Sequence, residues 1–234
     1  MAGGLRLREA DPTHSPGLKD AGVGMTSART RERLRRRLVQ AGIRHVELLD
    51  LMARLPRHRF VDEALASHAY EDASLPIGHG QTISQPYTVA RMTEALLEAC
   101  QPQCVLEIGS GSGYQTAVLA SLVRRVYSIE RVAALLDLAR GRLAALRLRN
   151  VRLRHGDGAF GWPEYAPFDA ILVTAAPPGI PRTLVQQLRV DGCMVLPIGL
   201  GADQVLARVI RTPVGYETEI LEPVNFVPLL NGLS

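Results

Sequence analysis

Three carboxylates occur within or just after short apolar segments, where strands of a parallel sheet would end. Glu107 lies inside the segment 105–108, and Glu130 and Asp157 follow the next two segments along the chain. Because the carboxyl ends of parallel strands meet at one edge of a sheet, we expect these side chains to surround one ligand. Glu130 can accept two hydrogen bonds from a ribose diol, and Asp157 can accept one from the exocyclic amine of adenine, with Gly158 leaving room for the ring. Glu107 is costly to bury without partners, so we expect it to bind N–H groups of the following turn or the cationic part of the ligand.

A glycine-rich turn, Gly-Ser-Gly-Ser-Gly over 109–113, joins the first of these strands to a predicted helix over 114–123. Glycine lets the backbone turn tightly and approach a ligand, and a strand, a glycine turn and a helix N-terminus together are typical of nucleotide-binding units. The register excludes a dinucleotide fingerprint, because Tyr114 or Thr116 stands where its third glycine is needed. A Walker motif is also missing, so a triphosphate fits badly. The three carboxylates suit an adenosine with a positively charged tail. An acidic residue before Gly-x-Gly-x-Gly resembles motif I of the class I S-adenosylmethionine-dependent methyltransferases.

A polar loop over 75–85 ends at Pro86, which begins a predicted helix that extends to about Glu98. A loop of this kind at a helix N-terminus can direct the hydroxyl of Ser84 and backbone N–H groups toward an anion. The alternative is that Ser84 only caps the helix.

The position of these residues depends on a regular alternation of strands and helices. Seven strands are predicted, over 105–108, 126–129, 151–154, 168–173, 192–198, 204–211 and 217–221. The helices between the first five cover 114–123, 132–146 and 181–188, and the last two strands form a hairpin around Pro213 and Gly215. This pattern predicts an α/β fold with a doubly wound, mostly parallel, Rossmann-like sheet of seven strands.

Before the sheet, we expect a disordered leader over 1–24 and one domain over 25–234. Residues 25–75 are a helical cap without chemistry of its own, and residues 76–234 are the cofactor-binding and catalytic core. The cap consists of helices from Thr26 to Gly42, capped by Thr26 or Ser27, and over 46–55 and 62–68.

The composition is typical of a globular protein and not of a membrane-spanning one. The chain is 47% hydrophobic and 21% charged, and no apolar run approaches the roughly 18 residues needed to cross a bilayer, so we expect a cytoplasmic protein without membrane contact. The net charge of +4 is the sum of +7 on residues 1–59 and −3 on residues 60–234. The run Arg29–Arg37 can contact phosphates, although a solvated helix face explains it better, and no nucleic acid is expected.

Three cysteines, Cys100, Cys104 and Cys193, lack a histidine pair at zinc-like spacing, which favours buried free thiols over a metal or redox site.

Five segments resemble the protein-L-isoaspartate O-methyltransferase family, especially its bacterial members. The most specific is 75–92, which contains Pro-Ile-Gly-His-Gly-Gln-Thr-Ile-Ser-Gln-Pro-Tyr-Thr-Val-Ala-Arg-Met. The others are the glycine motif over 105–116, the adenine loop over 155–158, the fourth-strand motif over 166–178 and the ending Phe-Val-Pro-Leu over 226–229. The resemblance extends over roughly residues 30–234, and the segment before Met25 departs from the compact bacterial pattern.

The resemblance implies methyl transfer from S-adenosylmethionine to the α-carboxylate of L-isoaspartyl residues in damaged proteins, with S-adenosylhomocysteine as product. It implies a class I methyltransferase that acts on isoaspartyl peptides and proteins. We also expect a monomer that binds no metal. Ser84 would be the active-site residue, and Thr174 and Ala175 would contact the peptide beside it. The donor-binding residues would be Gln81, Thr82, Ile83, Glu107, Gly109, Ser110, Gly111, Ser112, Gly113, Glu130, Arg131, Asp157 and Gly158.

Two alternatives remain open at this point. One is a class I methyltransferase that acts on a small molecule or on RNA. The other is a noncatalytic module that binds an adenosyl group, or that binds nucleic acid through Arg29–Arg37.

Overall fold

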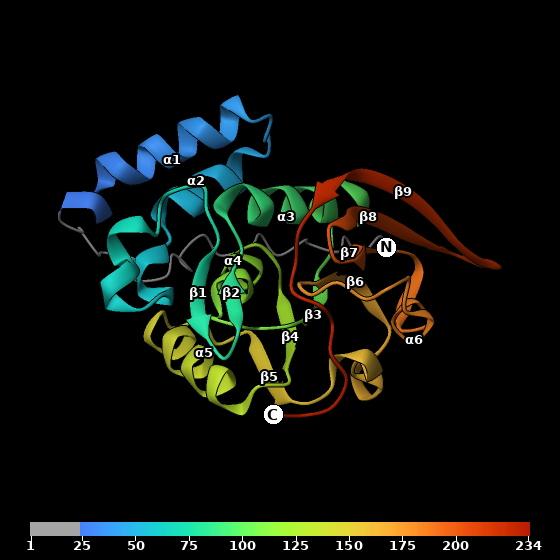
Figure 1. The fold of residues 1–234 in the computed structure, drawn as a ribbon. Coiled ribbons are helices and arrows are strands. Elements are labelled where there is room, and N and C mark those ends of the chain that lie inside the picture. The colour runs from blue at the N-terminus through green and yellow to red at the C-terminus, as the bar shows by residue number, and fades with distance from the viewer. Residues whose placement is uncertain (1–23) are drawn as a thin grey trace, which may run out of the picture.

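The computed structural model describes residues 24–234 and is built on a seven-stranded sheet of order β5-β4-β3-β6-β7-β8-β9 (Figure 1). Strands β3 to β7 are parallel, and β8 and β9 add an antiparallel edge. Their bounds are β3 Cys104–Ile108, β4 Arg125–Glu130, β5 Val151–His155, β6 Phe168–Val173, β7 Leu188–Leu200, β8 Asp203–Thr212 and β9 Gly215–Val224. The chain winds outward from β3 through β4 and β5 and then returns to place β6 on the other side of β3. The order of strands therefore reverses between β3 and β6, where α/β sheets bind ligands.

Helices cover both faces of the sheet. The α-helices of the described residues are α1 Ala28–Gln40, α2 Val46–Arg54, α3 Pro86–Cys100, α4 Tyr114–Leu122, α5 Ala133–Ala145 and α6 Arg182–Val185, of which α1 and α2 belong to the cap. On one face, buried residues of α3 and α4 such as Leu96 and Leu119 pack on Val105 and Val126 of the sheet. On the other, Leu184 of α6 packs with Leu106, whose side chain points the opposite way from that of its neighbour Val105. Both faces of the sheet are thus apolar and covered, as the predicted doubly wound fold requires.

The helical cap lies against α4. Leu34 and Leu38 of α1 and Leu48 of α2 belong to the same buried cluster as Tyr114 and Ala117 of α4. The cap and the helix that follows the glycine turn therefore share one core.

A short antiparallel hairpin stands apart from the main sheet. It consists of β1, Leu75–Gly78, and β2, Gln81–Ile83, and it leads into α3. The bend between its strands falls on His79 and Gly80, which have φ values of 55° and 67°. The polar loop predicted over 75–85 is thus a hairpin that delivers Ser84 to the start of a helix.

The seven predicted strands and their doubly wound arrangement are confirmed, with three local corrections. The helix predicted over 181–188 is only four residues long, because Leu188 already pairs with Phe168 as the first residue of β7. The segment predicted as helix over 62–68 is a 3-10 helix, Glu63–His68. Ser27 is the N-cap of α1, but its hydroxyl lies 3.3 Å from that of Thr30 and makes no capping bond.

The predicted leader over 1–24 lies outside the described residues, except for Gly24, which begins a 3-10 helix. None of the helices within residues 24–234 has the length and apolar character needed to span a bilayer.

Candidate active site

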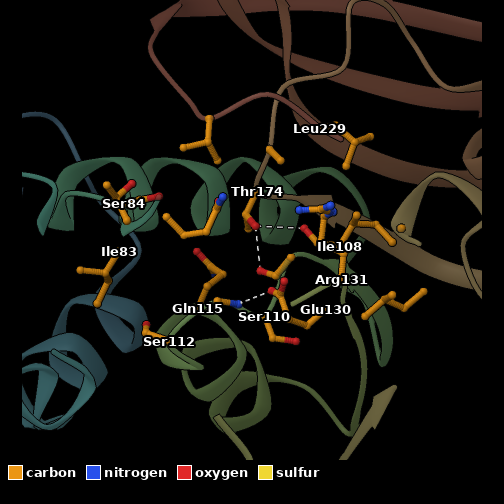
Figure 2. Close-up of a pocket in the computed structure, with 18 of the residues that line it drawn as sticks. Ile83, Ser84, Ile108, Ser110, Ser112, Gln115, Glu130, Arg131, Thr174 and Leu229 are labelled. Carbon is orange, nitrogen blue, oxygen red and sulfur yellow. Dashed lines mark hydrogen bonds between the residues drawn. The ribbon is translucent and has the colours of Figure 1, made fainter. Parts of the chain in front are cut away.

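A pocket lies at the carboxyl ends of β3, β4 and β6, at the point where the strand order reverses (Figure 2). In Figure 2, Ile83 and Ser84 lie on one side of it, Glu130 and Arg131 lie on the other, and Thr174 lies between them. The structure brings most of the predicted site residues together here: Gln81, Thr82, Ile83, Ser84, Gly109, Ser110, Gly111, Ser112, Glu130, Arg131, Gly158, Thr174 and Ala175 line it. Glu107, Gly113 and Asp157 do not.

Two glycines, one in the glycine turn and one in the loop after β5, permit close backbone approaches beside the pocket. Gly109 has a φ of 94°, and a Cβ added there would lie 2.3 Å from Oγ1 of Thr174. That hydroxyl lies 2.8 Å from the carbonyl oxygen of Gly109 and 3.0 Å from that of Ile108, to which it donates. A Cβ on Gly158 would lie 2.3 Å from Cγ2 of Ile108. The end of β3 therefore fits against both neighbouring loops only because glycine occupies these two positions.

Glu130 holds the glycine turn from the end of β4. Its Oε2 accepts a 2.8 Å hydrogen bond from the N–H of Gly111, and its Oε1 accepts one of 2.9 Å from the N–H of Val132. The residue is only 5% exposed, yet it lines the pocket. Each carboxylate oxygen accepts one bond from the protein and has capacity for a second, so Glu130 can still accept from a ligand diol.

Glu107 does not accept hydrogen bonds from the N–H groups of the turn, which corrects the first of its two expected roles; contact with the cationic part of the ligand stays a prediction. It is fully buried, and its Oε2 accepts hydrogen bonds from the hydroxyls of Thr116 and Ser128, the first at 2.5 Å. Its Oε1 has no partner among the described residues. Burial raises the pKa of Glu107 to about 7, although the two hydroxyl bonds oppose the shift. Glu107 thus ties β3 to α4 and β4 from beneath the pocket, because its side chain, like that of Val105 two residues earlier, points to the face of the sheet that α4 covers.

Asp157 also accepts hydrogen bonds from the protein itself. Its Oδ1 accepts a 2.9 Å bond from the N–H of Ala159, and its Oδ2 accepts one of 2.7 Å from the N–H of Gly232. The neighbouring Gly158 lines the pocket in its place. Asp157 therefore shapes the loop after β5 and anchors the C-terminal segment.

Ser84 is not a helix cap. The N-cap of α3 is Gln85, and no side chain caps that helix. The Ser84 hydroxyl makes no hydrogen bond with any described residue, whereas its carbonyl oxygen accepts a 2.7 Å bond from Nη2 of Arg57. The backbone at Ser84 is thus fixed, and its hydroxyl is free to bind a ligand.

A second pocket begins at the same serine. It is lined by Ser74, Thr82, Ser84, Gln85, Tyr87, Thr88, Thr174 and residues 222–227. Its wall is polar near Tyr87, whose hydroxyl donates a 3.0 Å bond to Glu222. Because Thr82, Ser84, Thr174 and Val227 line both pockets, these residues form the boundary between them.

The C-terminal segment closes the first pocket, and sequence reasoning assigned it no site residue. Ala176 donates a 2.8 Å bond to the carbonyl of Val227 and accepts one of 2.8 Å from the N–H of Leu229. Other lining residues that were not predicted are Val89, Met92, Ile108, Tyr114, Gln115, Ile129, Val227, Pro228, Leu229 and Leu230. The Phe-Val-Pro-Leu ending over 226–229 was the available signal for part of this set.

Within residues 24–234, no three His, Cys, Asp or Glu side chains gather as metal ligands. The three cysteines are free thiols, of which Cys193 is buried and Cys100 and Cys104 are half-buried. Cys100 lies near Cys193, with 2.8 Å between their sulfur atoms.

Comparison with known proteins points to one family. Residues 29–234 match the family model for protein-L-isoaspartate(D-aspartate) O-methyltransferase. The chain is 57% identical over 212 residues to protein-L-isoaspartate O-methyltransferase 1 of Marinobacter nauticus, covering 91% of this chain and 96% of the relative. It is 58% identical over 212 residues to the protein-L-isoaspartate O-methyltransferase of Halorhodospira halophila, with the same coverage of 91% and 96%.

Solved structures agree. One protein-L-isoaspartate O-methyltransferase superposes with a TM-score of 0.79 at 28% identity, covering 87% of this chain and 67% of that one. A Plasmodium falciparum protein described as the same enzyme, in complex with S-adenosyl-L-homocysteine, superposes with a TM-score of 0.75 at 26% identity, covering 86% and 98%.

The buried carboxyl of Glu107 predicts a pH dependence of stability. A carboxyl with a raised pKa binds its proton more tightly in the folded state, so its contribution to the free energy of unfolding falls as the pH rises from about 4.5 to about 7. The loss amounts to about 3 kcal/mol, at 1.36 kcal/mol for each pKa unit. We expect Glu107→Gln to remove this slope. Urea unfolding of both proteins between pH 4.5 and 8 measures the difference, and parallel curves for the two proteins would contradict the assignment.

The close approach at Gly109 predicts a second effect on stability. Gly109→Ala forces a Cβ into the hydroxyl of Thr174 and strains a backbone with positive φ. We expect the free energy of unfolding to fall by roughly 2–4 kcal/mol. Gly141→Ala is the matched control, because a Cβ at this exposed position of α5 meets nothing within 4 Å. It should leave stability unchanged or raise it by about 0.5–1 kcal/mol.

Proposed function

The chain belongs to the protein-L-isoaspartate(D-aspartate) O-methyltransferase family and is an S-adenosylmethionine-dependent protein carboxyl methyltransferase, and we propose how its own residues carry out this reaction. The methyl donor occupies the first pocket, the L-isoaspartyl peptide occupies the second, and Ser84 binds the reacting carboxylate where they meet. The observation that carries this assignment is the position of Ser84 on the wall of both pockets, with its hydroxyl unbonded.

The residues of the first pocket fit the donor. Glu130 offers two carboxylate oxygens at the end of β4 for a ribose diol, and Gly158 lines the pocket where the adenine ring lies, at a position where a Cβ would meet Cγ2 of Ile108 at 2.3 Å. Apolar side chains, including those of Ile129 and Leu229, complete the walls. When bound, S-adenosylmethionine supplies an electrophilic methyl group on a sulfonium.

The acceptor needs no strong base. A carboxylate with an ordinary pKa near 4 is ionised at neutral pH and is already the nucleophile. The hydroxyl of Ser84 can donate one hydrogen bond to it and so align its oxygen with the methyl group. Attack of an anion on a cation also neutralises charge, so a site without water favours the reaction. Residues 227–230 contribute to this by covering the first pocket.

The product is a methyl ester on the α-carboxylate, together with S-adenosylhomocysteine. The backbone amide nitrogen of the following residue then attacks the ester carbonyl and releases methanol to form a succinimide, which water reopens partly to normal aspartate. The identity of the acceptor is what separates this proposal from a methyltransferase for a small molecule or RNA. A monomeric state, a cytoplasmic location and the absence of a nucleic-acid partner stay predictions.

The acceptor is tested with a pair of synthetic peptides. With labelled S-adenosylmethionine, we expect methyl transfer to a peptide that contains L-isoaspartate and none to the same peptide with L-aspartate. The two peptides differ only in which carboxyl continues the main chain. Equal labelling of both, or labelling of neither, would contradict the proposed acceptor.

The role of Ser84 predicts a selective loss. Ser84→Ala should lower kcat about 10- to 100-fold, because a hydrogen bond to a charged group is worth roughly 1.5–3 kcal/mol. Calorimetric titration should show the Kd for S-adenosylhomocysteine changed by less than about twofold, since the hydroxyl lies at the edge of the donor pocket. Ser67→Ala, at an exposed position of the 3-10 helix Glu63–His68 and in neither pocket, is the control and should keep kcat within about twofold. An equal loss of donor affinity and turnover in Ser84→Ala would assign Ser84 to donor binding instead.

A further inference from the structure

Arg57 is a fully buried guanidinium in the helical cap, and it reaches two parts of the active site. It begins the 3-10 helix Arg57–Phe60 and is 0% exposed. Its Nε donates a 2.7 Å hydrogen bond to the carbonyl of Ala69, and its Nη2 donates one of 2.7 Å to the carbonyl of Ser84. Its guanidinium carbon lies 4.7 Å from the centre of the Tyr114 ring.

The placement of this charge is costly for the fold. None of the described carboxylates forms an ion pair with Arg57, and its Nη1 has no hydrogen-bond partner among the described residues. A buried charge without a counterion is expensive, and burial lowers the pKa of Arg57, although a guanidinium keeps its proton in proteins. An apolar side chain of similar volume would fill the space without this cost. Packing alone therefore does not explain why an arginine occupies this position.

The partners of Arg57 supply that explanation. Ser84 lies between the two pockets, and Tyr114 is the first residue of α4, directly after the glycine turn, and lines the donor pocket. A planar guanidinium can donate along its edge while its face rests on an aromatic ring. Arg57 thus fixes the backbone of Ser84 and the start of α4 relative to each other through one rigid group.

We propose that Arg57 is a positioning residue for methyl transfer, which sets the hydroxyl of Ser84 at the correct place relative to the methyl group of the donor. Arg57 does not touch the reacting atoms and acts only through Ser84. This inference rests on the proposed function of Ser84. It assigns part of the catalytic geometry to the helical cap, which on sequence grounds had no chemistry.

The fold contains a matched control in Arg31. This arginine is also buried in the cap, at 5% exposed, and it also donates to two carbonyl oxygens, those of Thr26 at 3.1 Å and Arg54 at 3.3 Å. Its guanidinium carbon likewise lies 5.9 Å from the centre of an aromatic ring, that of Tyr70. Arg31 makes no contact with Ser84, so Arg31→Lys perturbs the cap in the same way without reaching the site.

The test is a double-mutant cycle. Arg57→Lys keeps the charge, but one ammonium cannot reproduce the two directed bonds and the ring contact. In the protein with Ser84, we expect it to lower kcat about 10- to 100-fold, since a small misplacement of a positioning group has effects of this size. In the Ser84→Ala background, the same change should lower kcat less than about twofold, because the group that Arg57 positions is gone. Arg31→Lys should change kcat less than about twofold in either background.

A second readout does not depend on the substrate. Amide hydrogen exchange in peptides that cover residues 81–85 should be faster in Arg57→Lys and unchanged in Arg31→Lys, because only Arg57 holds the Ser84 carbonyl. The amide nitrogen of Arg57→Gln stands where Nε of Arg57 does, beside the Ala69 carbonyl and short of Ser84, so this variant should show the same faster exchange and the same lower kcat as Arg57→Lys. If the wild type fails to methylate the isoaspartyl peptide, the proposed function fails, while the exchange data still report on the contact.

Three results would overturn the positioning role. They are an equal loss of kcat from Arg57→Lys with and without Ser84, an equal loss from Arg31→Lys, and unchanged exchange over residues 81–85. If neither Arg57 variant folds while Arg31→Lys does, the guanidinium serves the fold itself and the proposal is also wrong.

Discussion

The hydrogen bond from the N–H of Gly111 to the carboxylate of Glu130 is the contact on which the site depends. It joins the turn after β3 to the end of β4, the neighbouring parallel strand, and adds to the backbone bonds that Gly109 and Ser110 donate to the carbonyl of Ile129. The second oxygen of Glu130 holds the N–H of Val132, which leads into α5. One side chain therefore fixes two loops that follow two strands. A carboxylate suits this task because it accepts several N–H bonds at once, and its charge strengthens each of them.

The fold was predictable where a local pattern has one structural outcome. Apolar runs separated by helices define the strands, and glycines with a required register define the turn after β3. The prediction failed at 181–188, where the apolar residues suit a helix, but Leu188 gains more by pairing with Phe168. No local pattern contains that information, because the partner strand lies twenty residues earlier in the chain.

For the site, the sequence predicted most of the residues that line the pocket but not their hydrogen-bond partners. Residues adjacent in sequence to the strand ends line the pocket, because the topology alone brings them there. The partners of individual carboxylates were not predictable. Asp157 binds the N–H of Gly232, and Glu107 binds the hydroxyls of Thr116 and Ser128. The hydrogen-bond partner of a carboxylate depends on the direction of its side chain and on which distant segments of the chain pack beside it. For the same reason the sequence did not predict the contact between Arg57 and the carbonyl of Ser84, which joins the helical cap to the start of α3.

The pairing of β3 with β6 determines at which stage of folding the donor pocket can form. Val105 of β3 pairs with Ala170 of β6, so the chain closes a long loop before this side of β3 has a partner. Parallel pairings of this range are slow steps in folding, because loop-closure entropy is lost before contacts compensate for it. Thr174 follows β6 and meets Gly109 only after that pairing. Partly folded chains that have completed β3, β4 and β5 therefore lack one wall of the donor pocket, so the ability to hold the donor should arise in the same cooperative event as closure of the sheet.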